Sequence, residues 1–135
     1  MVDGVEISTD PSRIDVALVH EFLGTTYWAA GRSREIIERS IANSLCFGAY
    51  AAGRQVAFGR VITDRALFGY LSDIFVIPEY RGRGVGKALV RAMLEHADVA
   101  GLQVMLLRTR DAHGLYEPFG FHALERPQEL LVRYA

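Results

Sequence analysis

The run Arg81-Gly-Arg-Gly-Val-Gly86 has the composition of a loop that holds the pyrophosphate of a bound cofactor. Gly84 and Gly86 lack the Cβ atoms that would keep phosphate oxygens away from the backbone, and basic side chains surround them. An apolar run precedes the loop and an amphipathic run follows it, so the first amides of a helix would point at the anion. We therefore predict a phosphate cradle formed by Arg81, Gly82, Arg83, Gly84, Val85, Gly86 and Lys87.

This loop differs from two familiar nucleotide-binding loops. It lacks the Gly-Lys-Ser/Thr ending of a P-loop, and it follows three antiparallel strand-like runs instead of opening a Rossmann unit. In isolation, the hexamer would also fit a plain turn with solvated arginines. The strand and helix on either side favour phosphate binding, so we expect a different pyrophosphate carrier.

Hydrophobic periodicity places the loop within a series of strands and helices. Helices are expected after the cap Asp10-Pro11, after the cap Ser33, from the loop to Ala97, and over 112–119. Strands are expected at 5–8, 45–52, 55–63, 68–77, 102–107, 121–124 and 129–134. The order β-α-α-β-β-β-α-β-α-β-β predicts an α/β fold (α+β mixed sheet) with helices on the sheet's faces.

The composition predicts one globular domain over residues 1–135. The chain has 135 residues, a mass of 15.0 kDa and a net charge of −1, which does not favour nonspecific binding to nucleic acid or anionic membranes. The single cysteine, Cys46, lies in an apolar run and is expected to be a buried structural thiol. Without a signal peptide or a bilayer-length apolar run, the sequence predicts a cytoplasmic protein.

Residues 73–89 resemble the acetyl-CoA signature of the GNAT superfamily of N-acetyltransferases. The core pattern of that signature, Arg/Gln-x-x-Gly-x-Gly/Ala, is met by Arg81, Gly84 and Gly86. A second segment, residues 112–121, is similar to the Ala-x-x-x-Tyr-x-x-x-Gly-Phe pattern of many members. The expected order of elements is also the family's order over nearly all of the chain, so the resemblance implies a GNAT-like fold.

The resemblance implies that the chain moves an acetyl group from acetyl-CoA to a primary amine by direct attack, without a metal or a covalent enzyme intermediate. In this family the strand before the loop splays from its neighbour, and its backbone binds the pantetheine arm. The matching residues are Phe75, Val76 and Ile77. Tyr116 matches the tyrosine that protonates the departing thiolate, and Thr109 falls where many members carry an asparagine that contacts pantetheine.

Asp73 is the best candidate for a general base, because it is a carboxylate in an otherwise mostly apolar strand. An alkylammonium with a pKa of about 10.4 must lose a proton before it attacks. A structural role for Asp73, or action through a water molecule, fits its position equally well. Where the diamine acetyltransferase branch often carries an acidic pair, Ser72 replaces the first acid, which weakens a polyamine assignment.

The connection between the first two helices shapes the acceptor site in this fold, and here it contains Tyr27, Trp28 and Arg32. The aromatic rings could enclose a cation and Arg32 could pair with a carboxylate, which makes all three candidate substrate-binding residues. Packing of the rings beneath the loop, with an exposed arginine, is the competing interpretation.

Two other functions remain open from the sequence. One is a noncatalytic acyl-CoA-binding sensor module, which the presence of Tyr116 disfavours. The other is a toxin that acetylates aminoacyl-tRNA, which would need a basic face. The expected partner is therefore a small-molecule or peptide amine, with no nucleic acid or membrane. The last strand, 129–134, fits either the end of the sheet or pairing with a second subunit in a homodimer.

Overall fold

The computed structural model describes residues 4–135, and residues 1–3 of the predicted domain lie outside that range. Five strands form one sheet in chain order, with antiparallel pairing from β1 to β4 and parallel pairing between β4 and β5. The strands are β1 (Glu6–Ser8), β2 (Leu45–Ala51), β3 (Arg54–Thr63), β4 (Phe68–Val76) and β5 (Val104–Leu107). The predicted mixed α/β sheet is confirmed.

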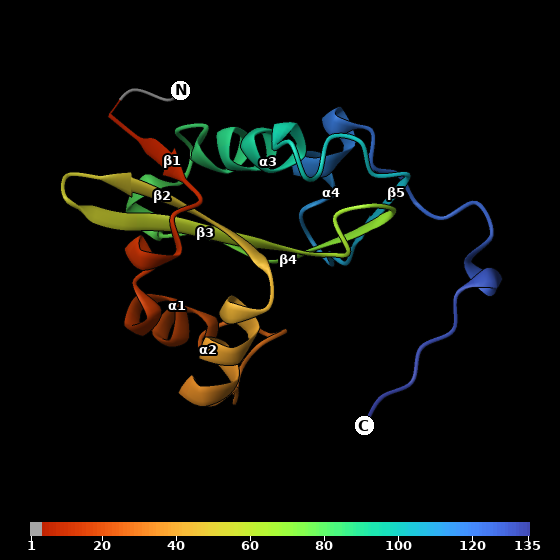
Figure 1. Ribbon diagram of the computed structural model, residues 1–135, viewed down its shortest axis with the longest axis horizontal. Coiled ribbons are helices and arrows are strands. Elements are labelled where there is room, and N and C mark those ends of the chain that lie inside the picture. Colours follow the sequence, from red (N-terminus) through yellow and green to blue (C-terminus); the bar gives the residue numbers. More distant parts are fainter. Residues whose placement is uncertain (1–3) are drawn as a thin grey trace.

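Helices cover both faces of this sheet. They are α1 (Val16–Leu23), α2 (Arg34–Ala42), α3 (Val85–Glu95) and α4 (His113–Tyr116). In Figure 1, α1 and α2 lie on one side of the strands and α3 lies on the other. Because helices cover both faces, β3 is buried along most of its length, and its apolar side chains join one core with those of the helices.

The first helix begins later than predicted. Asp10 caps only a 3-10 turn at Pro11–Arg13, after which the backbone is extended at Ile14. A second acid, Asp15, then accepts a hydrogen bond from the N–H of Leu18 at 3.0 Å and starts α1. Asp10 and Pro11 thus start a single 3-10 turn and not the first α-helix.

A β-bulge interrupts the pairing of β3 with β4. Phe58 pairs with Phe75 and Arg60 pairs with Ser72, so two residues of β4, Asp73 and Ile74, lie opposite Gly59 alone. Asp73 has a φ of 56°, the left-handed conformation found in one class of bulge. The bulge therefore bends β4 at Asp73.

The parallel pairing of β4 with β5 stops early. It runs from Phe68 opposite Val104 to Leu71 opposite Leu107, whereas β4 continues to pair with β3 as far as Val76. The edge of β4 from Ser72 to Val76 is therefore open on the β5 side. This is the splay that the family resemblance implied.

The two C-terminal strands predicted at 121–124 and 129–134 are wrong. Beyond Gly120 the chain forms one 3-10 turn, Pro127–Glu129, and no strand within the described residues. Both runs have strand-like compositions, but strand propensity stabilises a segment only when it packs and pairs with a neighbour. Figure 1 shows this tail running away from the sheet and helices.

Gly59 is the residue at which the bulge leaves least room. A Cβ there would lie 3.0 Å from the Met93 Sδ atom and 3.1 Å from the Ile74 Cγ1 atom. We expect Gly59→Ala to lower the free energy of unfolding by about 1–3 kcal/mol, measured by urea denaturation. The control is Gly101→Ala, where a Cβ meets nothing within 4 Å; equal stabilities of the two variants would contradict the tight packing.

Candidate functional site

The glycine-rich loop connects the end of β4 to the N-terminus of α3. Gly82 and Gly84 have φ values of 74° and 80°, a conformation that other residues adopt only with strain. Gly84 is the N-cap of α3 and has no side chain to satisfy the helix amides. The first helical hydrogen bond runs from the N–H of Ala88 to the Gly84 carbonyl, at 3.0 Å. The amides of residues 85–87 thus have no acceptor within the helix, and their binding of a pyrophosphate stays a prediction.

The basic side chains around the loop take different positions. Arg81 bends back, and its Nε atom donates to the Val76 carbonyl at 3.0 Å. The guanidinium of Arg83 lies over the Tyr80 ring, 4.9 Å from its centroid. Lys87 is exposed on the first turn of α3. All three residues belong to the loop or to the first turn of α3, where their charges would add to the field of the helix N-terminus.

The open edge of β4 offers the backbone groups of Val76. The N–H of Ile77 donates to the Val56 carbonyl at 2.9 Å, so the backbone of Ile77 faces β3. Because successive residues of a strand alternate, Val76 faces the open side and Phe75 faces β3. Of the three residues predicted to bind pantetheine through the backbone, only Val76 has its backbone groups on the open edge, and its carbonyl there accepts the hydrogen bond from Arg81. The side chains of Phe75 and Ile77 are buried in the core.

Tyr116 lies on α4 beside a cavity of about 740 Å³, which Thr109 and His113 also line. The Tyr116 side chain is buried, and its ring packs edge-on against that of Phe121. Burial, with a smaller contribution from Tyr27, raises the pKa of Tyr116 to about 12. Its hydroxyl therefore keeps its proton throughout the neutral range and can donate a hydrogen bond into the cavity.

Thr109 serves first as a local cap. Its Oγ1 atom accepts a hydrogen bond from the N–H of Ala112 at 3.0 Å and so fixes the turn that leads into α4. The hydroxyl proton of Thr109 is still available as a donor, because in this bond the oxygen accepts. The predicted cofactor contact and the capping role are therefore compatible.

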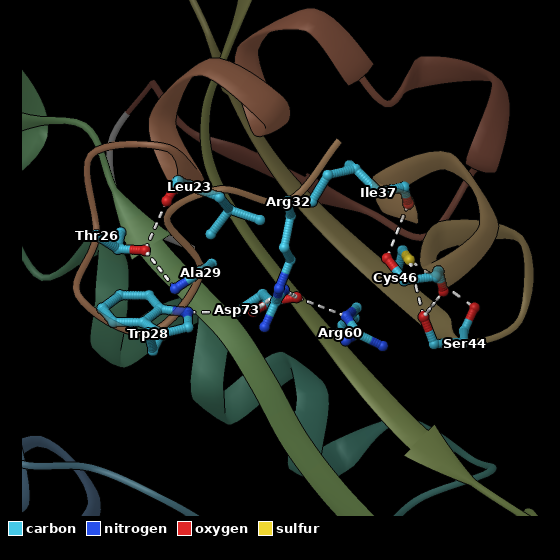
Figure 2. A network of polar contacts seen from close by, with 11 residues as sticks. Leu23, Thr26, Trp28, Ala29, Arg32, Ile37, Ser44, Cys46, Arg60 and Asp73 are labelled. Carbon is cyan, nitrogen blue, oxygen red and sulfur yellow. Dashed lines mark hydrogen bonds and ion pairs between the residues drawn. The ribbon is translucent and has the colours of Figure 1, made fainter. Parts of the chain in front are cut away.

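Asp73 is the centre of a buried ion-pair cluster (Figure 2). Its carboxylate accepts hydrogen bonds from the Arg60 Nε atom at 2.8 Å and from the Arg32 Nη1 atom at 2.9 and 3.0 Å. The Trp28 Nε1 atom donates to the same carboxylate at 3.1 Å. With both oxygens occupied and the side chain buried, Asp73 is poorly placed to take a proton from an amine.

The three predicted acceptor-site residues are brought to one place, but their contacts differ from those expected. Trp28 and Arg32 are both held by Asp73, so Arg32 already has a carboxylate partner. Tyr27 packs edge-on against Trp28, and its other neighbour is Arg110, whose guanidinium lies 3.6 Å from the centre of the Tyr27 ring. Both aromatic rings remain about half exposed and border the cluster.

Arg60 and Arg110 are parts of this site that sequence reasoning missed. Arg60 is a charged residue in the middle of the apolar run of β3, which is a signal that it needs a buried partner of opposite charge. Arg110 carried no such signal, because it follows β5 in an exposed connection.

Cys46 is buried on β2 near Ser44, and burial raises the pKa of its thiol. A thiol kept protonated in this way is a structural residue and a poor nucleophile. Among residues 4–135, no cluster of three or more His, Cys, Asp or Glu side chains is placed to hold a metal ion. Within the same range, no helix has the length and apolar character needed to cross a membrane.

Comparisons with known proteins agree with this geometry. A model of the acetyltransferase (GNAT) domain matches residues 42–123. A crystal structure of a GNAT-family protein from Xanthomonas campestris pv. campestris superposes with a TM-score of 0.96 and 48% identity, covering 100% of this chain and 96% of that one. An acetyltransferase-named protein of Gibberella zeae is 28% identical over 109 residues, 66% of this chain and 62% of its own length.

A glucosamine 6-phosphate N-acetyltransferase from Trypanosoma brucei brucei is 38% identical over 63 residues, which are 46% of this chain and 43% of the relative. The chain thus spans less than two thirds of the length of the curated relatives that it matches. The domain model covers β2 to β5, the glycine-rich loop, α3 and α4.

The structural role of Asp73 can be tested by Asp73→Asn, since asparagine tolerates a positive φ and keeps the size of the side chain. Removing the charge leaves two arginines facing each other, so we expect the free energy of unfolding to fall by about 3 kcal/mol. Chemical denaturation measures the change. Glu35→Gln, which breaks an exposed ion pair with Arg39, is the control and should cost no more than about 0.5 kcal/mol. Unchanged stability with lost turnover would instead restore Asp73 as the base.

Proposed function

The chain belongs to the GNAT family of acetyltransferases, and from that premise we propose that it transfers an acetyl group from acetyl-CoA to a primary amine of a small molecule or peptide. The proposal rests chiefly on one observation, the free amides of α3 at the end of a strand whose edge is open. One domain, residues 1–135, would carry the whole activity. A relative named glucosamine 6-phosphate N-acetyltransferase supports an amine as the acceptor.

The loop and the open edge fit the two ends of acetyl-CoA. The amides of residues 85–87, with Arg81, Arg83 and Lys87, would bind the pyrophosphate through charge-assisted hydrogen bonds of about 1.5–3 kcal/mol each. A Cβ at Gly86 would lie 3.7 Å from Val76 and 3.9 Å from Leu115, so this glycine faces the space between β4 and α4. The pantetheine arm would run through that space, with the polar groups of Val76 beside it and Thr109 as a further donor.

Acetyl-CoA supplies an acyl group activated as a thioester. In direct attack, the amine nitrogen forms a bond to the carbonyl carbon, the carbon–sulfur bond breaks, and the proton lost by the amine ends on the sulfur. Tyr116 would lie beside that sulfur and hold its proton toward it. This arrangement requires no enzyme nucleophile, in keeping with a buried, protonated Cys46.

The raised pKa of Tyr116 changes the role that the sequence suggested for it. Complete proton transfer from a phenol of pKa about 12 to a thiolate of pKa about 8.5 is uphill by about 5 kcal/mol. Donation of a hydrogen bond to the developing thiolate avoids that cost and still stabilises the transition state. We therefore assign Tyr116 as a hydrogen-bond donor to sulfur.

Asp73 is proposed to position the acceptor side of the site. Through its bonds to Trp28 and Arg32, it fixes two side chains that border the space an amine would enter. Trp28, which is about half exposed, would lie beside the acceptor in its ammonium form. Because the ion pairs of Asp73 leave it poorly placed to act as a base, attack would proceed from the minor neutral form of the bound amine.

Cofactor binding is tested by calorimetric titration of acetyl-CoA into Gly86→Glu. The new carboxylate would sit at a helix N-terminus, where it does not harm the fold, but it would repel and block the pyrophosphate. We expect at least about a tenfold loss of affinity, equivalent to about 1.4 kcal/mol. Gly86→Ala is the control, because its methyl group meets only ordinary contacts and should leave affinity within about threefold. Lack of binding by the unmodified chain would refute the proposal.

Turnover is tested by measuring thiol release with a panel of amines. Tyr116→Phe should lower kcat by about a hundredfold while leaving the affinity for acetyl-CoA unchanged, because only the transition-state hydrogen bond is removed. Tyr50→Phe, which removes a buried hydroxyl on β2 that has no hydrogen-bond partner among residues 4–135, should not change kcat. Binding without turnover on every amine would point to a sensor module, and an equal kcat for Tyr116→Phe would contradict the assigned role.

A further inference from the structure

Two arginines, Arg108 and Arg110, follow β5 where that strand parts from β4, and both are exposed. Within residues 4–135, eight other arginines form an ion pair with a carboxylate, whereas neither of these two does. Asp111, the next residue along the chain, is also exposed and pairs with neither. The positive charges of both guanidinium groups are therefore uncompensated and available to an anion.

Tyr27 holds Arg110 in place. The Arg110 Cζ atom lies 3.6 Å from the centre of the Tyr27 ring, and the backbone N–H of Arg110 donates to the Tyr27 hydroxyl at 3.3 Å. A guanidinium that lies on an aromatic face keeps the N–H groups along its edge for hydrogen bonds. Because this position is set before a ligand arrives, less side-chain entropy is lost on binding than for a freely solvated arginine.

Both arginines lie near the proposed reaction centre. Arg108 borders the cavity of about 740 Å³ that Thr109 and Tyr116 also line. Its Nη2 atom donates to the Tyr134 hydroxyl at 3.0 Å, and this neutral partner leaves the positive charge uncompensated. Tyr27, which carries Arg110, contributes after burial to the raised pKa of Tyr116, so the two tyrosines are close enough to interact. An anion held by the arginines would thus lie close to the thioester.

Tyr27 also connects Arg110 to the acceptor side of the site. Its ring packs edge-on against that of Trp28, with the centroids 5.2 Å apart, and the Trp28 Nε1 atom donates to Asp73 at 3.1 Å. Figure 2 shows this carboxylate among its two arginine partners, so one negative charge faces two positive charges there. The acceptor side therefore has an excess of positive charge, although the whole chain has a net charge of −1.

We propose that the acceptor amine also carries an anionic group, a carboxylate or a phosphate, and that Arg110 binds this group with Arg108 beside it. The assignment rests on the proposed function and deepens it by naming the class of amine that the chain would acetylate. The amino group would lie at Trp28, and the anionic group would reach the guanidinium that Tyr27 holds. Because Tyr27 contacts both side chains, one small molecule can span the two positions.

Arg110 thus takes the role that the sequence suggested for Arg32. Arg32 was expected to pair with a carboxylate of the substrate, but Asp73 already occupies it at 2.9 Å. The excess of positive charge has a second consequence, because it lowers the pKa of an ammonium group bound beside it. The fraction of neutral amine would rise, which suits a site whose carboxylate is already paired. A diamine would bring a second positive charge to the same place and is disfavoured.

Pairs of amines that differ in the anionic group test this assignment. A series of amino acids is compared with their carboxamides, and O-phosphoethanolamine is compared with ethanolamine, so that a preference for carboxylate is distinguished from one for phosphate. The value of kcat/KM for acetyl transfer is measured by thiol release. We expect the anionic member of at least one pair to be the better substrate by at least about tenfold, as for a charge-assisted contact.

Arg110→Gln should lower kcat/KM at least about tenfold for the anionic member of that pair, mainly through KM, and less than about threefold for the uncharged member. Each amine is compared between two forms of the enzyme, so differences in the pKa of the amines cancel. Arg110→Lys keeps the charge and should lose less than Arg110→Gln. The control is Arg91→Gln, because Arg91 is also exposed and lies over an aromatic ring, that of Phe119, at 5.6 Å; it should change neither member.

Each contrary result has a distinct meaning. Equal losses for both members of every pair would give Arg110 a structural role and overturn the assignment. So would a parallel loss of acetyl-CoA affinity in calorimetry, which would make Arg110 a cofactor contact. Turnover of uncharged amines without any preference for anionic ones would refute the assignment alone and leave the proposed function standing. Absence of turnover with every amine would contradict the proposed function, and the assignment with it.

Discussion

The ion pairs between Asp73 and the two arginines Arg60 and Arg32 are the interaction on which the site depends. Asp73 sits in a left-handed backbone conformation, which costs about 1–2 kcal/mol for a residue with a side chain. The ion pairs and hydrogen bonds of its buried carboxylate offset that cost and hold the bulge in place. The bulge begins at Asp73, two residues beyond Leu71, where the pairing of β4 with β5 ends. One buried carboxylate thus holds both the bulge in β4 and the connection between α1 and α2, which contains Trp28 and Arg32.

The parting of β4 from β5 gives the loop its use. If β4 and β5 were paired along their whole length, the backbone groups of Val76 would be hydrogen-bonded to β5. The sheet would then have no open edge beside the amides of α3. Instead, the free amides at the helix N-terminus lie beside an open strand edge, and Gly86 at this junction faces Val76 and the α4 residue Leu115. The chain belongs to the GNAT family, and we propose that this arrangement holds acetyl-CoA, a long cofactor with a charged end and a reactive end.

The features that sequence reasoning found are those with local causes. Gly82 and Gly84 of the loop adopt positive φ, Ser33 caps α2, and the spacing of apolar residues sets the face of α3. Tyr116 and Thr109 followed from a resemblance between linear motifs, which also depend on neighbouring residues along the chain. These features can be predicted from the sequence because the interacting atoms belong to residues that lie close together along the chain.

The sequence alone was sufficient for the mixed α/β fold and the family, and it placed the glycine-rich loop between a strand and a helix. It could not provide the partners of Asp73, since Arg32 and Arg60 lie 41 and 13 residues away along the chain and meet the carboxylate only when β3, β4 and the α1–α2 connection pack together. It also predicted two C-terminal strands that one chain does not form. Composition sets the tendency of a segment to be a strand, but the free energy of pairing comes from a neighbouring edge, which only the folded arrangement supplies or withholds.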